Sequence, residues 1–254
     1  MKQGFFISGN WKMHKTVAES LGFLTELEKN LSTLPDPKIE VAIFAPFTAL
    51  HVLSGRAVKV AIGAQNLFYE EKGAFTGEIS PPMLAELIQL VLIGHSERRQ
   101  FFKEDDTLVN RKILAAITHG LRPVLCIGET LAERDSGRAF ERLRAQLEAD
   151  LTGVTKAEAG RLMVAYEPIW AIGTGRTATP EQAGEAHGFI RGWLKERMGP
   201  DNGIRVIYGG SVNPENSAAL LSRPGIDGVL VGGASLKLEQ FSAIISHSLT
   251  LLRK

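Results

Sequence analysis

The chain has 254 residues, of which 44% are hydrophobic and 22% are charged, and its formal net charge at pH 7 is +1. These values are close to those of average globular proteins, which excludes an intrinsically disordered chain and leaves enough apolar residues for a large core. The small net charge gives no general attraction to nucleic acid or to a membrane surface, so an anionic ligand would need a local site.

Short apolar runs recur along the chain and predict its strands. In chain order they are residues 5–8, 41–44, 60–63, 91–93, 124–127, 163–166, 206–208 and 229–231. The runs do not alternate between apolar and polar residues, and this pattern is typical of parallel strands that are covered on both faces. Parallel neighbours cannot be joined by tight hairpins, so their connections must be crossovers.

Helix signals lie between these runs. Apolar residues at helical spacing form stripes, for example Val109, Ile113 and Ile117, and Phe140, Leu143, Leu147 and Leu151. Capping boxes are predicted at Thr16 with Glu19, Thr130 with Glu133, Thr155 with Glu158 and Thr179 with Gln182. Caps that precede a first-turn proline are predicted at Ser80 and Asn213. These signals place helix starts where the crossovers need them.

Eight units of strand and helix, at about 30 residues each, predict an α/β fold in which residues 1–254 form a single-domain, closed (β/α)8 barrel. A doubly wound open sheet is the alternative, and it would place a ligand at one switch point of the sheet. The chemically interesting residues follow many different strands, which favours the barrel.

The start of the chain and its cysteine content indicate the compartment. The apolar run at residues 5–8 is too short for the core of a signal peptide, and no stretch reaches transmembrane length. Cys126 is the single cysteine, so an internal disulfide framework is excluded, and its apolar surroundings predict a buried structural thiol. We therefore expect a cytoplasmic protein.

Polar residues and glycines follow most of the predicted strands. They are Asn10, Lys12, Gln65, His95, Ser96, Glu97, Glu167, Ser211, Gly232 and Gly233. In a (β/α)8 barrel the carboxyl ends of all strands meet at one face, where active sites lie. Each of these residues alone would more often be an ordinary surface residue. Their shared position predicts one common site.

The segment 165–178 sets Glu167 at the end of an apolar strand and then continues into a glycine-spaced loop. This order predicts a catalytic base beside a movable cover, whereas a surface loop that happens to carry one acidic residue is the alternative. Residues 173–177 resemble a nucleotide P-loop only superficially, because that motif needs a glycine where this chain has Trp170. ATP binding is not expected.

Two glycine pairs leave the last two predicted strands, namely Gly209-Gly210 before Ser211, and Gly232-Gly233. Such glycines in a barrel often form a phosphate site, with the N-terminus of a short helix, here residues 233–236, directed at it. Either pair alone would more often be a tight turn. Together on neighbouring strands, they predict a phosphate-binding site.

Of the six histidines, five lie in helical or connecting stretches, and the chain contains no spaced ligand set for a metal ion. No metal is expected. His95 differs because it follows a predicted strand and precedes a probable helix start. A helix N-terminus disfavours the imidazolium, so His95 should stay neutral and act as a hydrogen-bond donor or proton shuttle.

The connection from Asn66 to Ile79 contains neither a helical stripe nor a strand pattern. Its apolar residues argue against disorder; they are Leu67, Phe68, Tyr69 and Phe75. Exposure of so much apolar surface would be unusual unless a partner covered it. We expect a subunit interface, with a loop folded onto its own domain as the alternative.

Together these segments closely resemble the triosephosphate isomerase family. The resemblance is carried by residues 10–12 (NWK), 94–99 (GHSERR), 165–175 (AYEPIWAIGTG), 208–212 (YGGSV) and 232–233 (GG). It implies a TIM barrel that reversibly interconverts dihydroxyacetone phosphate and D-glyceraldehyde 3-phosphate through an enediolate, in glycolysis and gluconeogenesis. It also implies a homodimer that needs no cofactor.

The resemblance implies a catalytic role for several residues by matching position. Glu167 would be the base that moves a proton between two substrate carbons, and His95 would be the neutral electrophile. Lys12 would stabilise negative charge, and Asn10 would hold Lys12 and a substrate oxygen in place. Glu97 would contact Lys12 from outside the site.

Further roles implied by the resemblance concern binding, the lid and the dimer. Backbone N–H groups would bind the phosphate; they belong to Gly173, Ser211, Gly232 and Gly233. Ser96 would be the resting partner of the base while the lid is open. Thr76, with Phe75 beside it, would contact Asn10 and Lys12 of the partner subunit. Arg176 in the lid is often lysine in this family, and it keeps the positive charge.

Two other functions would explain part of this pattern. A barrel isomerase or aldolase could act on a larger sugar phosphate, but a Schiff-base aldolase needs a lysine inside the barrel, and the predicted strands contain none. A non-catalytic protein that binds phosphosugars could keep the glycine pairs and Lys12. It would not need Glu167 and His95 together.

Overall fold

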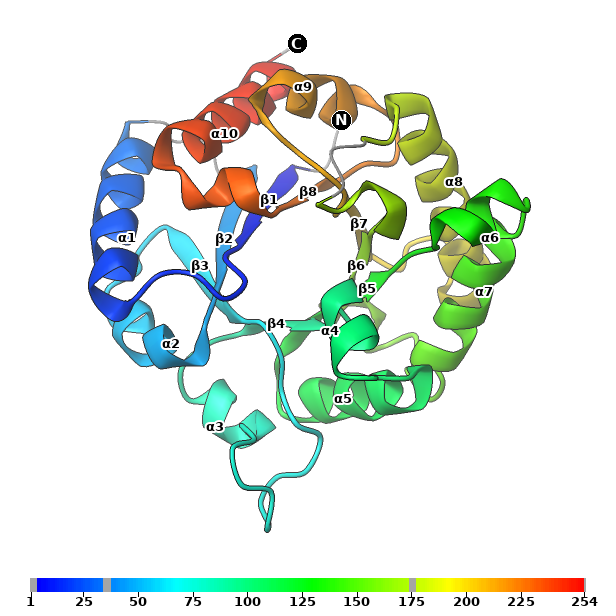
Figure 1. Ribbon diagram of the computed structural model, residues 1–254, viewed down its shortest axis with the longest axis horizontal. Coiled ribbons are helices and arrows are strands. Elements are labelled where there is room, and N and C mark those ends of the chain that lie inside the picture. The colour runs from blue at the N-terminus through cyan, green and yellow to red at the C-terminus, as the bar shows by residue number, and fades with distance from the viewer. Residues whose placement is uncertain (1–3, 34–37, 174–176, 254) are drawn as a thin grey trace.

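The computed structural model describes residues 4–33, 38–173 and 177–253, with the strands β1 to β8 at its centre (Figure 1). Each strand pairs in parallel with the next along the chain, and β8 pairs with β1, so the sheet closes into a barrel. The strands are β1 Phe5–Asn10, β2 Ile39–Ala45, β3 Val60–Ala64, β4 Leu90–Ile93, β5 Arg122–Ile127, β6 Met163–Tyr166, β7 Arg205–Tyr208 and β8 Gly228–Val231. The predicted (β/α)8 barrel is confirmed, and the open sheet is excluded.

Helices form a ring around the barrel (Figure 1). The α-helices are α1 Val17–Ser32, α2 Phe47–Ser54, α3 Pro81–Ala85, α4 Ser96–Phe101, α5 Asp106–Thr118, α6 Leu131–Asp135, α7 Ala139–Asp150, α8 Pro180–Met198, α9 Pro214–Ser222 and α10 Leu238–Leu252. Short 3-10 helices are η1 Ala159–Arg161, η2 Ile169–Ala171 and η3 Gly233–Leu236. Within the described part of the chain, no helix is both long enough and apolar enough to cross a membrane.

The core has two layers because each strand is apolar on both faces. One set of alternate strand residues fills the barrel, among them Phe6, Phe44, Leu92 and Ile207. The other set packs outward against the helices, which contribute residues such as Ile113 to the same cluster. Successive side chains of a strand point to opposite faces, so both sets must be apolar when both faces are covered. This arrangement explains why the strand sequences do not alternate.

Most of the predicted helix starts are confirmed. Thr16, Thr130 and Thr179 each form a capping box, and Ser80 and Asn213 accept hydrogen bonds from the first helical turn.

The helix predicted at Thr155 is wrong. Only half of the expected capping box forms: the Thr155 backbone N–H donates to Glu158 Oε2 at 2.9 Å, whereas the Glu158 backbone N–H donates to the carbonyl of Thr155 at 3.1 Å. The chain nevertheless forms only a turn followed by η1, because Gly160 disfavours a helix and β6 already begins at Met163.

The connection from Asn66 to Ile79 has neither helix nor strand, as predicted, and extends away from the barrel beside α3 (Figure 1). Its apolar residues are covered more than the sequence analysis expected. Leu67 is fully buried, and the rings of Phe68 and Tyr69 pack on each other with centroids 4.2 Å apart. Phe75 remains 42% exposed. The loop therefore folds partly onto its own subunit and leaves mainly its outer part uncovered.

Candidate active site

A cavity of about 350 Å³ opens at the carboxyl ends of the strands. Sequence-predicted residues that line it are Asn10, Lys12, His95, Glu167, Gly173, Ser211, Gly232 and Gly233. They follow or end β1, β4, β6, β7 and β8, or lie in the segment after β6, so the barrel brings distant parts of the chain together. Ser96 and Glu97 lie directly behind the cavity wall, whereas Phe75 and Thr76 do not line this cavity.

Glu167 is the residue immediately after β6, and its side chain is buried. Its backbone N–H donates to the carbonyl of Ile127 on β5 at 2.7 Å, which fixes the end of the strand. One carboxylate oxygen, Oε2, accepts a hydrogen bond from the backbone N–H of Ser96 at 3.0 Å. The other, Oε1, lies 3.2 Å from Nε2 of His95. The carboxylate thus lies directly beside the imidazole in the lining of the cavity, and its Oε1 has no hydrogen-bond partner among the described residues.

His95 stands at the N-cap of α4, and its two ring nitrogens have different partners. Nδ1 accepts a hydrogen bond from the backbone N–H of Glu97 at 3.2 Å, so Nδ1 carries no proton in this arrangement. A neutral imidazole then carries its proton on Nε2, the nitrogen that points toward Glu167. The contact with the Glu97 N–H therefore places the donor of a neutral ring, Nε2, on the side of Glu167.

Lys12 is held by its neighbours in an uncommon conformation. Its φ angle is 51°, in the left-handed region that residues with a side chain seldom adopt. Asn10 Oδ1 accepts a hydrogen bond from the Lys12 backbone N–H at 2.9 Å, and Gln65 Nε2 donates to the Lys12 carbonyl at 2.8 Å. The ammonium lies 2.5 Å from Glu97 Oε1. The cavity therefore contains a cation whose backbone and side chain are both fixed.

The two glycines after β7 are required by close packing, whereas a Cβ atom on Gly232 after β8 would make only an ordinary contact, 3.8 Å from Cε of Lys12, and one on Gly233 would meet no described atom within 4 Å. A Cβ atom on Gly209 would lie 2.9 Å from Cγ of Glu167, and one on Gly210 would lie 2.3 Å from the hydroxyl oxygen of Tyr208. Gly232 precedes η3, the predicted short helix, which begins at Gly233. Backbone N–H groups at such a helix start are suited to binding an anion.

Comparison with known proteins decides the family. A family model described as triosephosphate isomerase matches residues 5–248. The chain belongs to the triosephosphate isomerase family. The triosephosphate isomerase of Carboxydothermus hydrogenoformans is 49% identical over 251 residues, which cover 96% of this chain and 98% of that protein.

Two further members of the triosephosphate isomerase family are similar over nearly their whole length. The triosephosphate isomerase of Caldanaerobacter subterraneus subsp. tengcongensis is 45% identical over 247 residues, which cover 95% of this chain and 98% of that protein. That of Geobacter metallireducens is 49% identical over 247 residues, which cover 95% of this chain and 97% of the relative. The chain is therefore an enzyme of the isomerase class.

A buried carboxylate that the sequence did not single out lies beside the segment after β6. Glu129 is fully buried, and its Oε1 accepts hydrogen bonds from Arg134 Nε at 2.7 Å, Tyr166 OH at 3.0 Å and Trp170 Nε1 at 2.8 Å. These bonds join the segment after β6 to the segment after β5. Glu129 follows a strand, as the other site residues do, so its position was a signal. Arg176 lies outside the described residues.

Two apolar residues that the sequence analysis did not single out, Ile172 and Leu230, also line the cavity. Their sequence surroundings do not separate them from core residues. In the described part of the chain, no group of three His, Cys, Asp or Glu side chains is placed to hold a metal ion. That the reaction needs neither metal nor cofactor stays a prediction.

Proposed function

We propose that this chain interconverts dihydroxyacetone phosphate and D-glyceraldehyde 3-phosphate through an enediolate, without a metal or cofactor. The observation that carries the proposal is the pairing of Glu167 Oε1 and His95 Nε2, which lie 3.2 Å apart in a cavity that also contains a lysine and two glycine pairs. A base, a hydrogen-bond donor and a site for an anion are the groups this reaction requires.

The phosphate group of the substrate would bind at the glycine side of the cavity. Backbone N–H groups of Gly173, Ser211, Gly232 and Gly233 would donate to its oxygens, and Lys12 would balance its charge. A cavity of about 350 Å³ lies at the small end of the usual range of ligand pockets, roughly 300–1,000 Å³. The size favours a three-carbon phosphate over a larger sugar phosphate.

Proton transfer would begin at Glu167. The carboxylate takes a proton from C1 of dihydroxyacetone phosphate, the electron pair of that C–H bond forms the new double bond between C1 and C2, and the π pair of the carbonyl moves to the oxygen at C2. His95 donates its Nε2 proton to that oxygen and takes one from the hydroxyl at C1. The protonated Glu167 then returns its proton to C2, and a carbonyl forms at C1. Atoms, electrons and charge balance over the cycle.

Charge stabilisation would come from Lys12 and from His95. Once closure excludes water, the negative charge that develops on the enediolate oxygens would meet a fixed ammonium and a fixed donor, which are worth far more there than in water. Asn10 contributes by holding the backbone of Lys12. A positioned base alone contributes about 10² to 10⁴ in rate, so both effects are needed for an efficient enzyme.

The contacts of Ser96 and Glu97 fit a resting state. With the Ser96 N–H bound to Glu167 Oε2, the base is held against α4, and closure of the segment 168–178 would move it toward the substrate. Lys12 is likewise paired with Glu97 until an anion competes for it. Closing the lid would also keep water from the enediolate and so prevent loss of phosphate.

The dimer is part of the same proposal. A pocket of about 200 Å³ opens beside Lys12, with Gln65 and Phe102 in its wall. Met13 and Phe102, which border it, are 95% and 64% exposed. An apolar edge around a polar pocket supports an interface in which Thr76 of the partner subunit enters there. The cytoplasmic location stays a prediction.

A coupled assay of triose phosphate interconversion tests the function. Glu167→Gln keeps the size of the side chain and removes the base, so kcat should fall by a factor of about 10² to 10⁴. Glu185→Gln on the exposed face of α8 is the matched control and should leave kcat unchanged. A folded wild type that is inactive on triose phosphates, or that prefers larger sugar phosphates, would refute the proposal. So would full activity of Glu167→Gln.

A further inference from the structure

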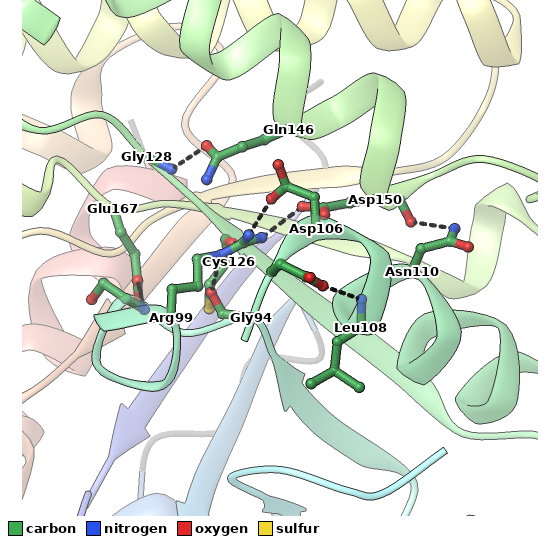
Figure 2. A network of polar contacts seen from close by, with 12 residues as sticks. Gly94, Arg99, Asp106, Leu108, Asn110, Cys126, Gly128, Gln146, Asp150 and Glu167 are labelled. Atoms are coloured by element: carbon green, nitrogen blue, oxygen red, sulfur yellow. Dashed lines mark hydrogen bonds and ion pairs between the residues drawn. The ribbon is translucent and has the colours of Figure 1, made fainter. Parts of the chain in front are cut away.

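Arg99 is a charged side chain of α4 that lies between Gly94, Cys126, Asp106 and Asp150 (Figure 2). Its side chain is only 11% exposed. Nε donates to the carbonyl of Gly94 at 2.8 Å, and Nη2 donates to the carbonyl of Cys126 at 3.3 Å. Gly94 precedes His95, and Cys126 lies on β5. One guanidinium therefore connects the turn that holds the imidazole to the strand beside β6.

The turn before His95 is built around this guanidinium. Gly94 has a φ angle of 73°, and a Cβ atom there would lie 2.9 Å from Arg99 Nη2. A residue with a side chain would thus meet both a strained backbone and a steric clash. Since the backbone conformation of Gly94 sets the direction in which His95 leaves the strand, Arg99 acts on the position of the imidazole through the backbone of Gly94.

Two carboxylates from different helices hold Arg99 in place. Asp150, the last residue of α7, accepts from Nη2 at 2.7 Å and is fully buried. Asp106, the first residue of α5, accepts from Nη1. Figure 2 shows the guanidinium pointing toward both. Because the arginine fork has fixed geometry, two carboxylates on rigid helices fix its plane as well as its charge.

The same helix also supports the segment next to Glu167. Gln146 lies one turn before Asp150 in α7, and its Oε1 accepts a hydrogen bond from the backbone N–H of Gly128 at 3.0 Å. A Cβ atom on Gly128 would lie 1.7 Å from the carbonyl oxygen of Glu167, so these two backbones are in close contact. Helix α7 therefore supports the turn before His95 through Asp150 and Arg99, and the segment next to Glu167 through Gln146 and Gly128.

We propose that Arg99, held by Asp106 and Asp150, is a positioning residue that fixes the imidazole of His95 relative to the carboxylate of Glu167. The inference rests on the proposed function, because it assigns those two residues to the reaction. The backbones before His95 and at Glu167 together set the separation of 3.2 Å between Nε2 and Oε1. The Arg99 guanidinium binds the first backbone directly, at Gly94, and supports the second through Cys126 on β5.

The chain offers a matched control in Arg191 of α8. Its Nε also donates to a glycine carbonyl, that of Gly225, at 2.8 Å, and its Nη2 also donates to a largely buried aspartate, Asp227. Neither Arg191 nor these partners line the cavity. If Arg99 had only a structural role, lysine substitutions at the two arginines should have the same kind of effect.

Arg99→Lys and Arg191→Lys test the proposal. Lysine keeps the charge that the buried aspartates need but cannot reproduce the fork. We expect Arg99→Lys to lower kcat by about tenfold or more with KM changed less than about twofold, since a misplacement near 1 Å can cost about a hundredfold. Arg191→Lys should leave kcat within about twofold of wild type, and its loss of stability should be smaller because Arg191 is 37% exposed and pairs with one aspartate.

A second measurement does not depend on activity. Nitrogen-15 spectra of the His95 ring report its tautomer and its hydrogen bonds, and its signals should shift in Arg99→Lys but not in Arg191→Lys. The proposal is overturned if Arg99→Lys keeps wild-type kcat and wild-type ring signals, or if both lysine variants lose kcat equally. An inactive wild type would overturn the proposed function, while the ring signals would still decide the role of Arg99.

A milder variant covers the case in which Arg99→Lys does not fold. Asp106 is 24% exposed, so Asp106→Asn weakens one support of the guanidinium without leaving a deeply buried charge unpaired. The His95 ring signals should then shift in the same sense by a smaller amount. Unchanged ring signals and unchanged kcat in folded Asp106→Asn would count against the proposal.

Discussion

The Lys12 backbone N–H donates a hydrogen bond to Asn10 Oδ1 at 2.9 Å, and through it the last residue of β1 holds Lys12 at a φ angle of 51°. A left-handed conformation costs a residue with a Cβ atom roughly 1–2 kcal/mol. Strain of this kind persists where the surrounding structure enforces it, and it commonly marks functional sites. The position of the ammonium thus costs the protein some stability.

Because of this strain, two substitutions of Lys12 should lower activity alike but differ in stability. Lys12→Met and Lys12→Gly both remove the ammonium and its contact with Glu97, so kcat/KM should fall at least about a hundredfold in each. Glycine adopts positive φ without penalty, so Lys12→Gly should have a free energy of unfolding about 1 kcal/mol above that of Lys12→Met. Urea unfolding measures the difference. Equal stability of the two variants would mean that the backbone of Lys12 is not strained.

Gly209 leaves the space that the side chain of Glu167 occupies, so a larger residue there should displace the proposed base. In Gly209→Ala the added methyl group would lie 2.9 Å from Cγ of Glu167, and the buried carboxylate would have to move. We expect kcat to fall by about tenfold to a hundredfold, together with an overpacking cost of about 1–3 kcal/mol in stability. Steady-state kinetics and urea unfolding measure the two effects.

Gly188→Ala is the control for that substitution. Gly188 is exposed in α8, and among the described atoms none outside the adjoining backbone of the helix lies within 4 Å of the position that an added methyl group would take. Alanine there should stabilise the protein by up to about 1 kcal/mol and leave kcat unchanged. If Gly209→Ala also kept wild-type kcat, the close contact with Glu167 would have no catalytic importance.

Much of the fold was predictable because its signals are local. Strands with two apolar faces can be recognised from their own residues, and so can caps such as Thr16 and Thr179. At Thr155 the local signal was partly genuine, since the Glu158 carboxylate does accept from the Thr155 backbone N–H, but the next strand begins too soon for a helix. Helix formation there is decided by the length of the connection, which the capping pattern does not report.

The catalytic candidates were predictable from their place after strands, whereas their supports were not. Arg98 and Arg99 are neighbours with the same charge, yet Arg98 pairs with Glu104 and Arg99 turns inward to Asp150. The choice depends on a partner 51 residues away in sequence. Glu129 likewise bonds to Trp170, 41 residues away. Such contacts exist only once the barrel has closed.

The proposed dimer predicts that a cation on the tip of the long connection will separate the subunits. In Thr76→Arg the new guanidinium would enter a pocket whose wall already contains Lys12 and Arg98, and a pocket of about 200 Å³ leaves little room for it. We expect a monomer in sedimentation velocity at micromolar concentration. Thr25→Arg, on an exposed position of α1, should stay dimeric. A wild type that sediments as a stable monomer would refute the interface.

His187 predicts how stability depends on pH. It is fully buried in α8, with Nδ1 3.1 Å from the carbonyl oxygen of Gly225, and burial lowers the pKa of its imidazole from 6.5 to about 4. Above pH 6.5 the ring is neutral in both the folded and the unfolded chain, and its contribution is fully present. Between pH 6.5 and pH 4 the unfolded chain binds a proton that the folded protein does not bind, so stability falls as pH falls.

At pH 4 the free energy of unfolding should be lower by about 3 kcal/mol because of His187, since each pKa unit corresponds to about 1.4 kcal/mol. In His187→Asn the amide can still donate to Gly225 but does not titrate, so the free energy of unfolding should decline less steeply over this range. Urea unfolding at several pH values measures both slopes. His51→Asn, at an exposed position of α2, should keep the wild-type slope. If His187→Asn also kept the wild-type slope, the loss of stability in acid would have to come from other groups. A histidine with the same pKa in the folded and the unfolded chain does not make the free energy of unfolding depend on pH.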